Sequence, residues 1–134
     1  MQSRNSFKKK MKKIILILPL LLLLVSCYNQ ERNCAAFKTG KFVFTQVIDS
    51  VKKTSTFERT ENIQIENFEG KIDTASIRWI NDCEYILTKL NPKNREEKKV
   101  ISMKILITNK KTYTFEYSFV GENKKQKGIV TKLD

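Results

Sequence analysis

Apolar side chains recur at every second position in one segment after another of this chain. The clearest case is residues 112–119, in which four aromatic side chains alternate with polar ones: Tyr113, Phe115, Tyr117 and Phe119. Successive side chains of a β-strand point to opposite faces, so this alternation predicts a strand with one apolar face. Phe42 and Phe44 follow the same rule. We therefore expect an all-β fold.

Turn-forming residues such as Glu69-Gly70 and Asn81-Asp82 divide the chain into about eight such segments. Short turns between consecutive strands favour an antiparallel meander of about seven or eight strands, closed as a small barrel or left as a strongly curved sheet. A helix is possible only at residues 94–99, where Asn94 could cap it and Glu97 lies three positions on. The strands are expected near 41–48, 54–60, 62–68, 72–80, 83–90, 99–108, 112–120 and 128–133.

The N-terminal residues 1–26 have the pattern of an export signal. Six basic residues precede an apolar run of 12 residues, from Ile14 to Val25, and the segment contains no acidic residue. As a helix this run is about 18 Å long, which is short against a hydrocarbon core of roughly 30 Å. It therefore fits the core of a signal peptide, with translation starting at Met1 or Met11.

Leu24-Val25-Ser26-Cys27 resembles the bacterial lipobox, in which a cysteine accepts diacylglycerol and then an N-acyl chain. The resemblance implies cleavage before Cys27, with these covalent lipids as the only attached group. An ordinary signal peptide or a short uncleaved anchor is the alternative. Residues 27–35 are then the lipidated cysteine with a short tether, and residues 36–134 form the domain. Tyr28 is not the aspartate that retains lipoproteins in the inner membrane of enteric bacteria, so the outer membrane, facing the periplasm, is expected.

Two further cysteines, Cys34 and Cys83, remain in the exported chain. An even number of cysteines in an oxidising compartment predicts a disulfide, which would join the start of the domain to its middle. Two buried thiols or a redox pair are the alternatives, although the chain has no Cys-x-x-Cys spacing.

The composition removes most catalytic machinery. The 134 residues include no histidine, which excludes Ser-His-Asp and Cys-His arrangements and histidine-ligated metal sites. Asp82 and Glu84 are two residues apart and would merely share a strand face. The formal charge is +12, with 26 basic and 14 acidic residues, but removal of the signal leaves about +6. Export argues against a nucleic-acid partner, so we expect neither an enzyme nor a nucleic-acid-binding protein.

Two blocks resemble a family of small lipoproteins of the Bacteroidota: Phe37-Lys38-Thr39-Gly40-Lys41-Phe42 and Arg78-Trp79-Ile80-Asn81-Asp82-Cys83-Glu84-Tyr85. The resemblance covers residues 34 to about 133 and implies a barrel similar in outline to lipocalins. The family has no established function. Some members carry a DNA topoisomerase name, which does not suit a chain this short and exported.

Trp79 and Tyr85 flank the Asn81-Asp82 turn and are expected to pair across a hairpin that Cys83 would fix in place. Such aromatics either fill the core or line a ligand pocket. The residues with this double interpretation are Phe42, Phe44, Trp79, Tyr85, Phe115 and Phe119.

Two functions follow from this double interpretation. If the aromatics fill the barrel, the protein is an accessory or structural domain of the envelope that acts through contacts with another protein. The small size of the mature chain favours this reading. If the aromatics enclose a space, the protein is a lipocalin-like carrier of a small apolar or amphipathic ligand, with lysines at the mouth meeting an anionic head group.

Overall fold

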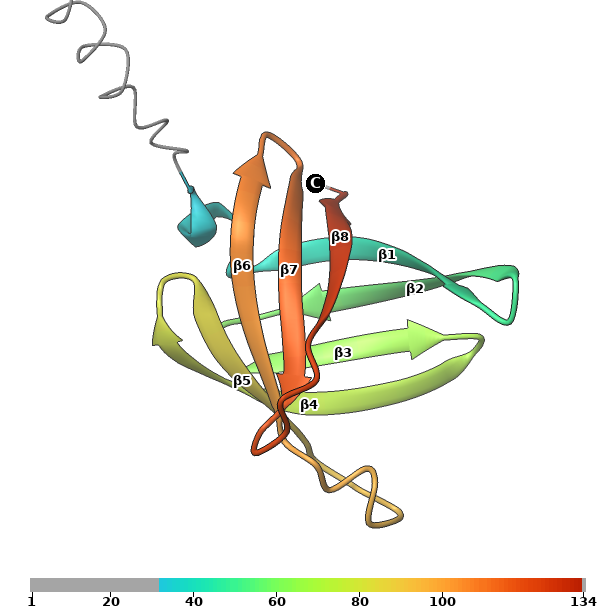
Figure 1. Ribbon diagram of the computed structural model, residues 1–134. Helices are drawn as coiled ribbons and strands as arrows, with labels where there is room; N and C mark the ends of the chain where they lie inside the picture. The colour runs from blue at the N-terminus through green and yellow to red at the C-terminus, as the bar shows by residue number, and fades with distance from the viewer. Residues whose placement is uncertain (1–31, 134) are drawn as a thin grey trace, which may run out of the picture. The chain divides into compact units, whose positions relative to one another are not determined.

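A closed barrel of eight antiparallel strands forms from residues 32–133, the part of the chain that the computed structural model describes (Figure 1). Each strand pairs with the next, and β8 pairs with β1 to close the sheet. The expected all-β meander is therefore confirmed, and the sheet closes. The strands are β1 (Gly40–Ile48), β2 (Val51–Arg59), β3 (Ile63–Phe68), β4 (Lys71–Asn81), β5 (Glu84–Lys89), β6 (Ile101–Asn109), β7 (Thr112–Phe119) and β8 (Gln126–Lys132).

The barrel is strongly coiled. In Figure 1, β1 to β4 run across the view, whereas β6 to β8 run nearly upright. Closure depends on a short ladder in which Phe42 lies opposite Lys132 and Phe44 lies opposite Val130. Because the ends of the sheet pair with each other, no strand edge along this ladder is left to associate with another chain.

Two local expectations differ from the structure. β2 starts at Val51 rather than at residue 54, because Asp49 and Ser50 both have positive φ (49° and 63°) and make a tight hairpin turn. The helix considered for residues 94–99 is absent. Asn94 Oδ1 does accept a hydrogen bond from the Glu97 N–H (2.9 Å), and Glu97 Oε2 accepts one from the Lys93 N–H (2.8 Å). These bonds close a turn, and no helix follows it.

A short 3-10 helix, η1 (Cys34–Phe37), lies against one end of the barrel, where Cys34 and Phe37 are each only 2% exposed. The Phe37 ring packs edge-on against Tyr113, with 5.1 Å between the ring centroids. Asn33 N–H donates a 2.8 Å hydrogen bond to Thr108 Oγ1 on β6. We call this the closed end of the barrel.

The expected disulfide between Cys34 and Cys83 is present and joins η1 to the turn between β4 and β5. The expected cross-hairpin pair is present beside it: Trp79 lies opposite Tyr85 in the ladder, with 4.5 Å between ring centroids. Lys38 Nζ lies 5.1 Å from the Trp79 ring and 2.9 Å from Asp82 Oδ1. The hairpin is thus tied to η1 by a covalent bond and an ion pair.

The contact pattern separates Met1–Gln30 from Glu31–Asp134, and the second unit contains all eight strands, the disulfide and the buried core. Cys34 and Ala35, assigned to the tether from the sequence, belong to η1. The proposed signal peptide (1–26) and lipidation site (Cys27) lie outside the described residues. Within residues 32–133 there is no helix that is both long and apolar enough to cross a bilayer.

Candidate functional site

A cavity of about 230 Å3 lies in the middle of the barrel and is partly open to solvent; we call it the inner cavity. Seven of the eight strands contribute inward-facing side chains to its wall. Most of these side chains are apolar or aromatic, and a few are polar. The lining residues are Phe44, Gln46, Ser55, Phe57, Arg59, Gln64, Glu66, Tyr85, Leu87, Ile101, Met103, Tyr113, Phe115, Tyr117 and Val130.

The six aromatic residues singled out from the sequence divide among four places. Phe44, Tyr85 and Phe115 line the inner cavity. Phe42 is fully buried at the closed end and stacks on Phe57, with ring centroids 5.0 Å apart. Trp79 packs behind Tyr85, outside the cavity lining. Phe119 lines a second cavity, described below.

The inner cavity is bounded toward the closed end by Arg59, which is only 2% exposed. Its side chain donates hydrogen bonds to the Phe37 carbonyl (2.8 Å), Gln64 Oε1 (3.2 Å) and the hydroxyls of Tyr85 (2.8 Å) and Tyr113 (3.0 Å). The guanidinium carbon also lies within 6.0 Å of four aromatic ring centroids: Phe42, Phe57, Tyr85 and Tyr113. All of these partners are neutral.

The electrostatics keep Arg59 charged and Tyr85 neutral. Burial acts to lower the pKa of Arg59, but its attraction to Tyr85 and Tyr113 and its hydrogen bonds to them raise that pKa above its ordinary value. Burial raises the pKa of Tyr85 far above its ordinary value, which the nearby Arg59 offsets only in part. At neutral pH the barrel therefore holds a guanidinium cation beside the neutral phenol of Tyr85.

Two buried polar atoms in the barrel lack a hydrogen-bond partner. One is Ser55 Oγ, on a residue only 2% exposed that lines the inner cavity. The other is Trp79 Nε1, beside the disulfide-linked hairpin. A buried polar atom without a partner costs roughly 1–3 kcal/mol, so the Ser55 hydroxyl favours an occupant of the cavity with a polar atom within its reach.

A second cavity of about 350 Å3, the outer cavity, adjoins the inner one and shares four lining residues with it: Gln64, Glu66, Leu87 and Ile101. Its other walls come from β4, β5, Phe119 and the loop of residues 90–100 between β5 and β6. The outer cavity forms the mouth of the barrel.

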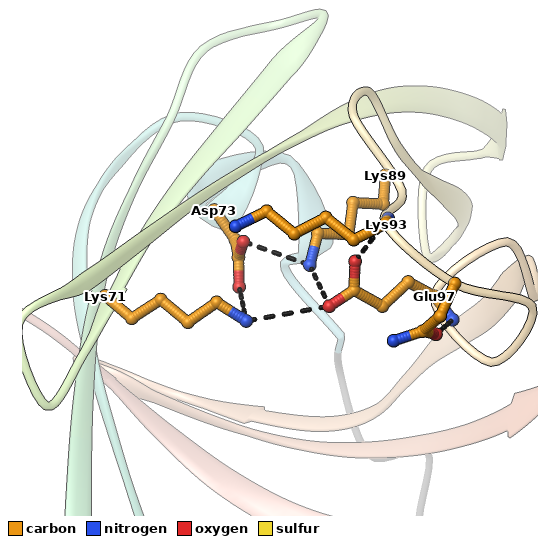
Figure 2. Close-up of polar contacts among 6 residues, drawn as sticks. Lys71, Asp73, Lys89, Lys93 and Glu97 are labelled. Carbon is orange, nitrogen blue, oxygen red and sulfur yellow. Dashed lines mark hydrogen bonds and ion pairs between the residues drawn. The ribbon is translucent and has the colours of Figure 1, made fainter.

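Ion pairs hold this loop against the strands (Figure 2). Glu97 Oε1 lies 3.0 Å from Lys89 Nζ and 3.6 Å from Lys71 Nζ, and Asp73 pairs with the same two lysines at 3.0 and 3.7 Å. The hydrogen bond from the Lys93 N–H and the one from Lys89 lower the pKa of Glu97 to about 2. The lysines expected at the mouth are therefore paired with carboxylates.

The two carboxylates considered for acid–base chemistry are also paired. Asp82 pairs with Lys38, and Glu84 Oε1 lies 3.1 Å from Lys104 Nζ, which together with Asn81 lowers the pKa of Glu84. Within residues 32–133 no three acidic or cysteine side chains gather closely enough to hold a metal ion.

Sequence reasoning missed Arg59, Ser55 and Gln64. The signal was present, because Ser55, Phe57 and Arg59 alternate along β2 and so share the inward face with a buried phenylalanine. A charged residue on an apolar strand face is uncommon, and its inward direction became evident only with the closed sheet.

No protein-family model, curated protein or solved structure matches this chain. The fold is thus defined by its own geometry: an eight-stranded meander barrel with one closed end, an internal cavity and a mouth covered by a loop. Such a barrel is compatible with a lipocalin-like carrier.

Proposed function

We propose that this protein is a non-catalytic carrier that holds a small, partly apolar molecule inside its barrel. The observation that carries the proposal is the inner cavity, whose mainly apolar wall contains a few polar groups, as ligand sites usually do. The unpartnered hydroxyl of Ser55 supports an occupant. Eight-stranded barrels of this kind have room for one small ligand.

The size of the cavity restricts the ligand. The inner cavity, at about 230 Å3, is smaller than the roughly 300–1,000 Å3 of most small-molecule sites. A larger ligand would extend into the adjoining outer cavity of about 350 Å3. The expectation of a filled interior applies to the closed end, where Phe42, Ile105 and Tyr113 are almost completely buried.

The cellular setting is part of the same proposal. Lipidation at Cys27 would anchor the barrel to the outer membrane, facing the periplasm, where apolar ligands are exchanged. The lipobox-like residues Leu24-Val25-Ser26-Cys27 support this setting, as does the disulfide, which forms in oxidising compartments. Membership of the small Bacteroidota lipoprotein family stays a proposal that rests on the two sequence blocks around Phe42 and Trp79.

Native mass spectrometry tests the carrier function. Residues 31–134, which contain every strand and the disulfide, would be produced in the periplasm and purified without detergent. The expected result is an added mass that is lost on denaturation. Met103→Trp, which fills the inner cavity, should abolish this mass, whereas Ile107→Trp, at a 39% exposed position of β6, should retain it. A bare protein that also takes up nothing from a lipid extract would reject the carrier function.

A second candidate function is an accessory domain that contacts an envelope protein. A shallow groove on the barrel is lined in part by three exposed apolar side chains, Ile65, Ile72 and Leu133, which favours such contacts. Cross-linking in cells from a photoreactive residue at position 72 would test it. A single cross-linked partner, absent with the same residue at position 61, is the expected result.

A further inference from the structure

The guanidinium of Arg59 lies at the inner end of the inner cavity, and no carboxylate of residues 32–133 forms an ion pair with it, although Glu66 is part of the same lining. Arg59 forms no ion pair there, and each of its hydrogen-bond acceptors is a carbonyl, a carboxamide or a hydroxyl. A buried ion costs several kcal/mol in effective desolvation. The four aromatic rings around it offset this cost by up to about 2 kcal/mol for each desolvated contact, but none of them carries a full negative charge. The site would therefore be stabilised by a bound anion.

The groups around Arg59 also retain donors that face the cavity. Gln64 uses its carboxamide oxygen to accept from Arg59, which leaves its NH2 group as a donor. Tyr85 and Tyr113 accept from Arg59 through their hydroxyl oxygens. The two hydroxyls also bond to each other, and this bond uses the hydrogen of only one of them. The O–H of the other tyrosine is therefore free to donate. All four residues line the inner cavity.

Resting on the carrier function proposed above, we propose that the ligand is a monocarboxylate with an aliphatic chain, bound with its carboxylate at Arg59, Gln64 and Tyr113. The chain runs from there past Met103 and Phe115 toward the outer cavity. Leu87 and Ile101, which line both cavities, continue the apolar path to the mouth.

The charges elsewhere fix this orientation. At the mouth, the two lysines that line the outer cavity, Lys89 and Lys99, are both paired with carboxylates, so this lining offers an anionic head group no unpaired cation. Inside, Glu66 lines both cavities and makes no hydrogen bond or ion pair with another described residue. Its carboxylate would repel an anion placed midway along the cavity, which leaves the Arg59 end as the favourable position.

The charges in the lining of the inner cavity also favour a ligand whose head group carries a single negative charge. One guanidinium faces the cavity, and the one carboxylate in the lining, Glu66, is of like sign to the ligand. A second negative charge on the head group would be buried without a partner. A monoalkyl phosphate dianion should therefore bind more weakly than a carboxylate of the same chain length.

Isothermal titration calorimetry at pH 7.4 with decanoate, decan-1-ol and decyl phosphate tests this inference on residues 31–134. Decanoate should bind at least about tenfold more tightly than decan-1-ol, the difference of about 1.4 kcal/mol that one charge-assisted hydrogen bond supplies. Equal binding of decanoate and decanol would overturn the carboxylate site and leave the carrier function standing. If none of the three binds, the site for an aliphatic carboxylate is rejected, and the native mass measurement described above decides separately whether the carrier function stands. Tighter binding of decyl phosphate would overturn the choice of a single charge.

Two isosteric variants change the cavity charge in opposite directions without removing Arg59. Gln64→Glu keeps an acceptor for Arg59 and supplies an internal counter-charge, so decanoate affinity should fall at least about tenfold while decanol affinity is unchanged. Glu66→Gln removes the repulsion, so decanoate affinity should rise about threefold or more. Asn123→Asp and Glu61→Gln make the corresponding charge changes at exposed positions and should have no effect. If Gln64→Glu leaves decanoate binding intact, Arg59 is only a structural tie of the closed end.

Discussion

Arg59 Nη2 donates a 2.8 Å hydrogen bond to the hydroxyl of Tyr85, and the guanidinium carbon lies 4.8 Å from the centroid of the Tyr85 ring. The two side chains come from β2 and β5, which are not neighbours in the sheet. Their contact crosses the barrel interior. It joins the wall of the inner cavity to the closed end, where Phe37 accepts another hydrogen bond from Arg59.

Tyr85→Phe removes one acceptor of the buried guanidinium and keeps the aromatic ring. We expect a loss of about 1–3 kcal/mol in the free energy of unfolding, because a hydrogen bond to a charged buried group is lost without replacement. Urea denaturation measures this loss in the free energy of unfolding. Tyr117→Phe removes a hydroxyl that bonds to Gln126 at an exposed position and should cost less than about 0.5 kcal/mol. Equal losses in the two variants would contradict a special role for the Arg59 contact.

Gly128→Ala should destabilise the barrel by overpacking. A Cβ at this position would lie 2.7 Å from Phe44 Cε2 and 2.8 Å from the Phe115 ring. Both rings line the inner cavity and would have to leave their present packing to admit the added methyl group. We expect a loss of about 1–3 kcal/mol by thermal or urea unfolding. Adding Phe44→Leu should restore part of the loss, and if it adds a further independent loss the steric explanation is wrong.

Reduction of the Cys34–Cys83 disulfide should lower stability by about 2–4 kcal/mol, because it frees a long loop in the unfolded chain. The Cys34→Ala/Cys83→Ala variant should show the same loss, and dithiothreitol should not affect it further. Unfolding curves with and without reductant measure both effects. No change on reduction would mean that η1 is held by Phe37 and the Arg59 hydrogen bonds alone.

The loop of residues 90–100 should loosen in acid. Hydrogen bonds from the Lys93 N–H and Lys89 lower the pKa of Glu97 from its ordinary 4.5 to about 2. Because the folded pKa is the lower one, the contribution of Glu97 to loop order is complete above about pH 4.5 and is lost as pH falls toward 2. The protection factor of the Lys93 amide, which is its NMR exchange rate compared with the intrinsic rate at each pH, should fall over this range. Glu97→Gln should show low protection at all pH values, whereas Glu61→Gln should behave as wild type.

Part of the candidate site was accessible from the sequence. The alternation of Tyr113, Phe115 and Tyr117 identified an apolar strand face, and all three residues line the inner cavity. Phe44 was selected for the same reason, whereas Tyr85 and Trp79 were selected as a pair that flanks the Asn81-Asp82 turn. Phe119 carries the alternation signal but lies outside the inner cavity, because alternation assigns a face and leaves the height along the barrel undetermined.

By itself, the sequence determined what depends on neighbours in the chain. Side-chain alternation and turn residues set eight strands and their approximate limits, and the two cysteines left after Cys27 indicated one disulfide. Only the tertiary structure decided that β1 and β8 pair to close the barrel, because that ladder joins residues some 90 positions apart. It also decided which side chains surround Arg59. Burial and electrostatic partnership depend on distances across the barrel interior, which no local pattern encodes.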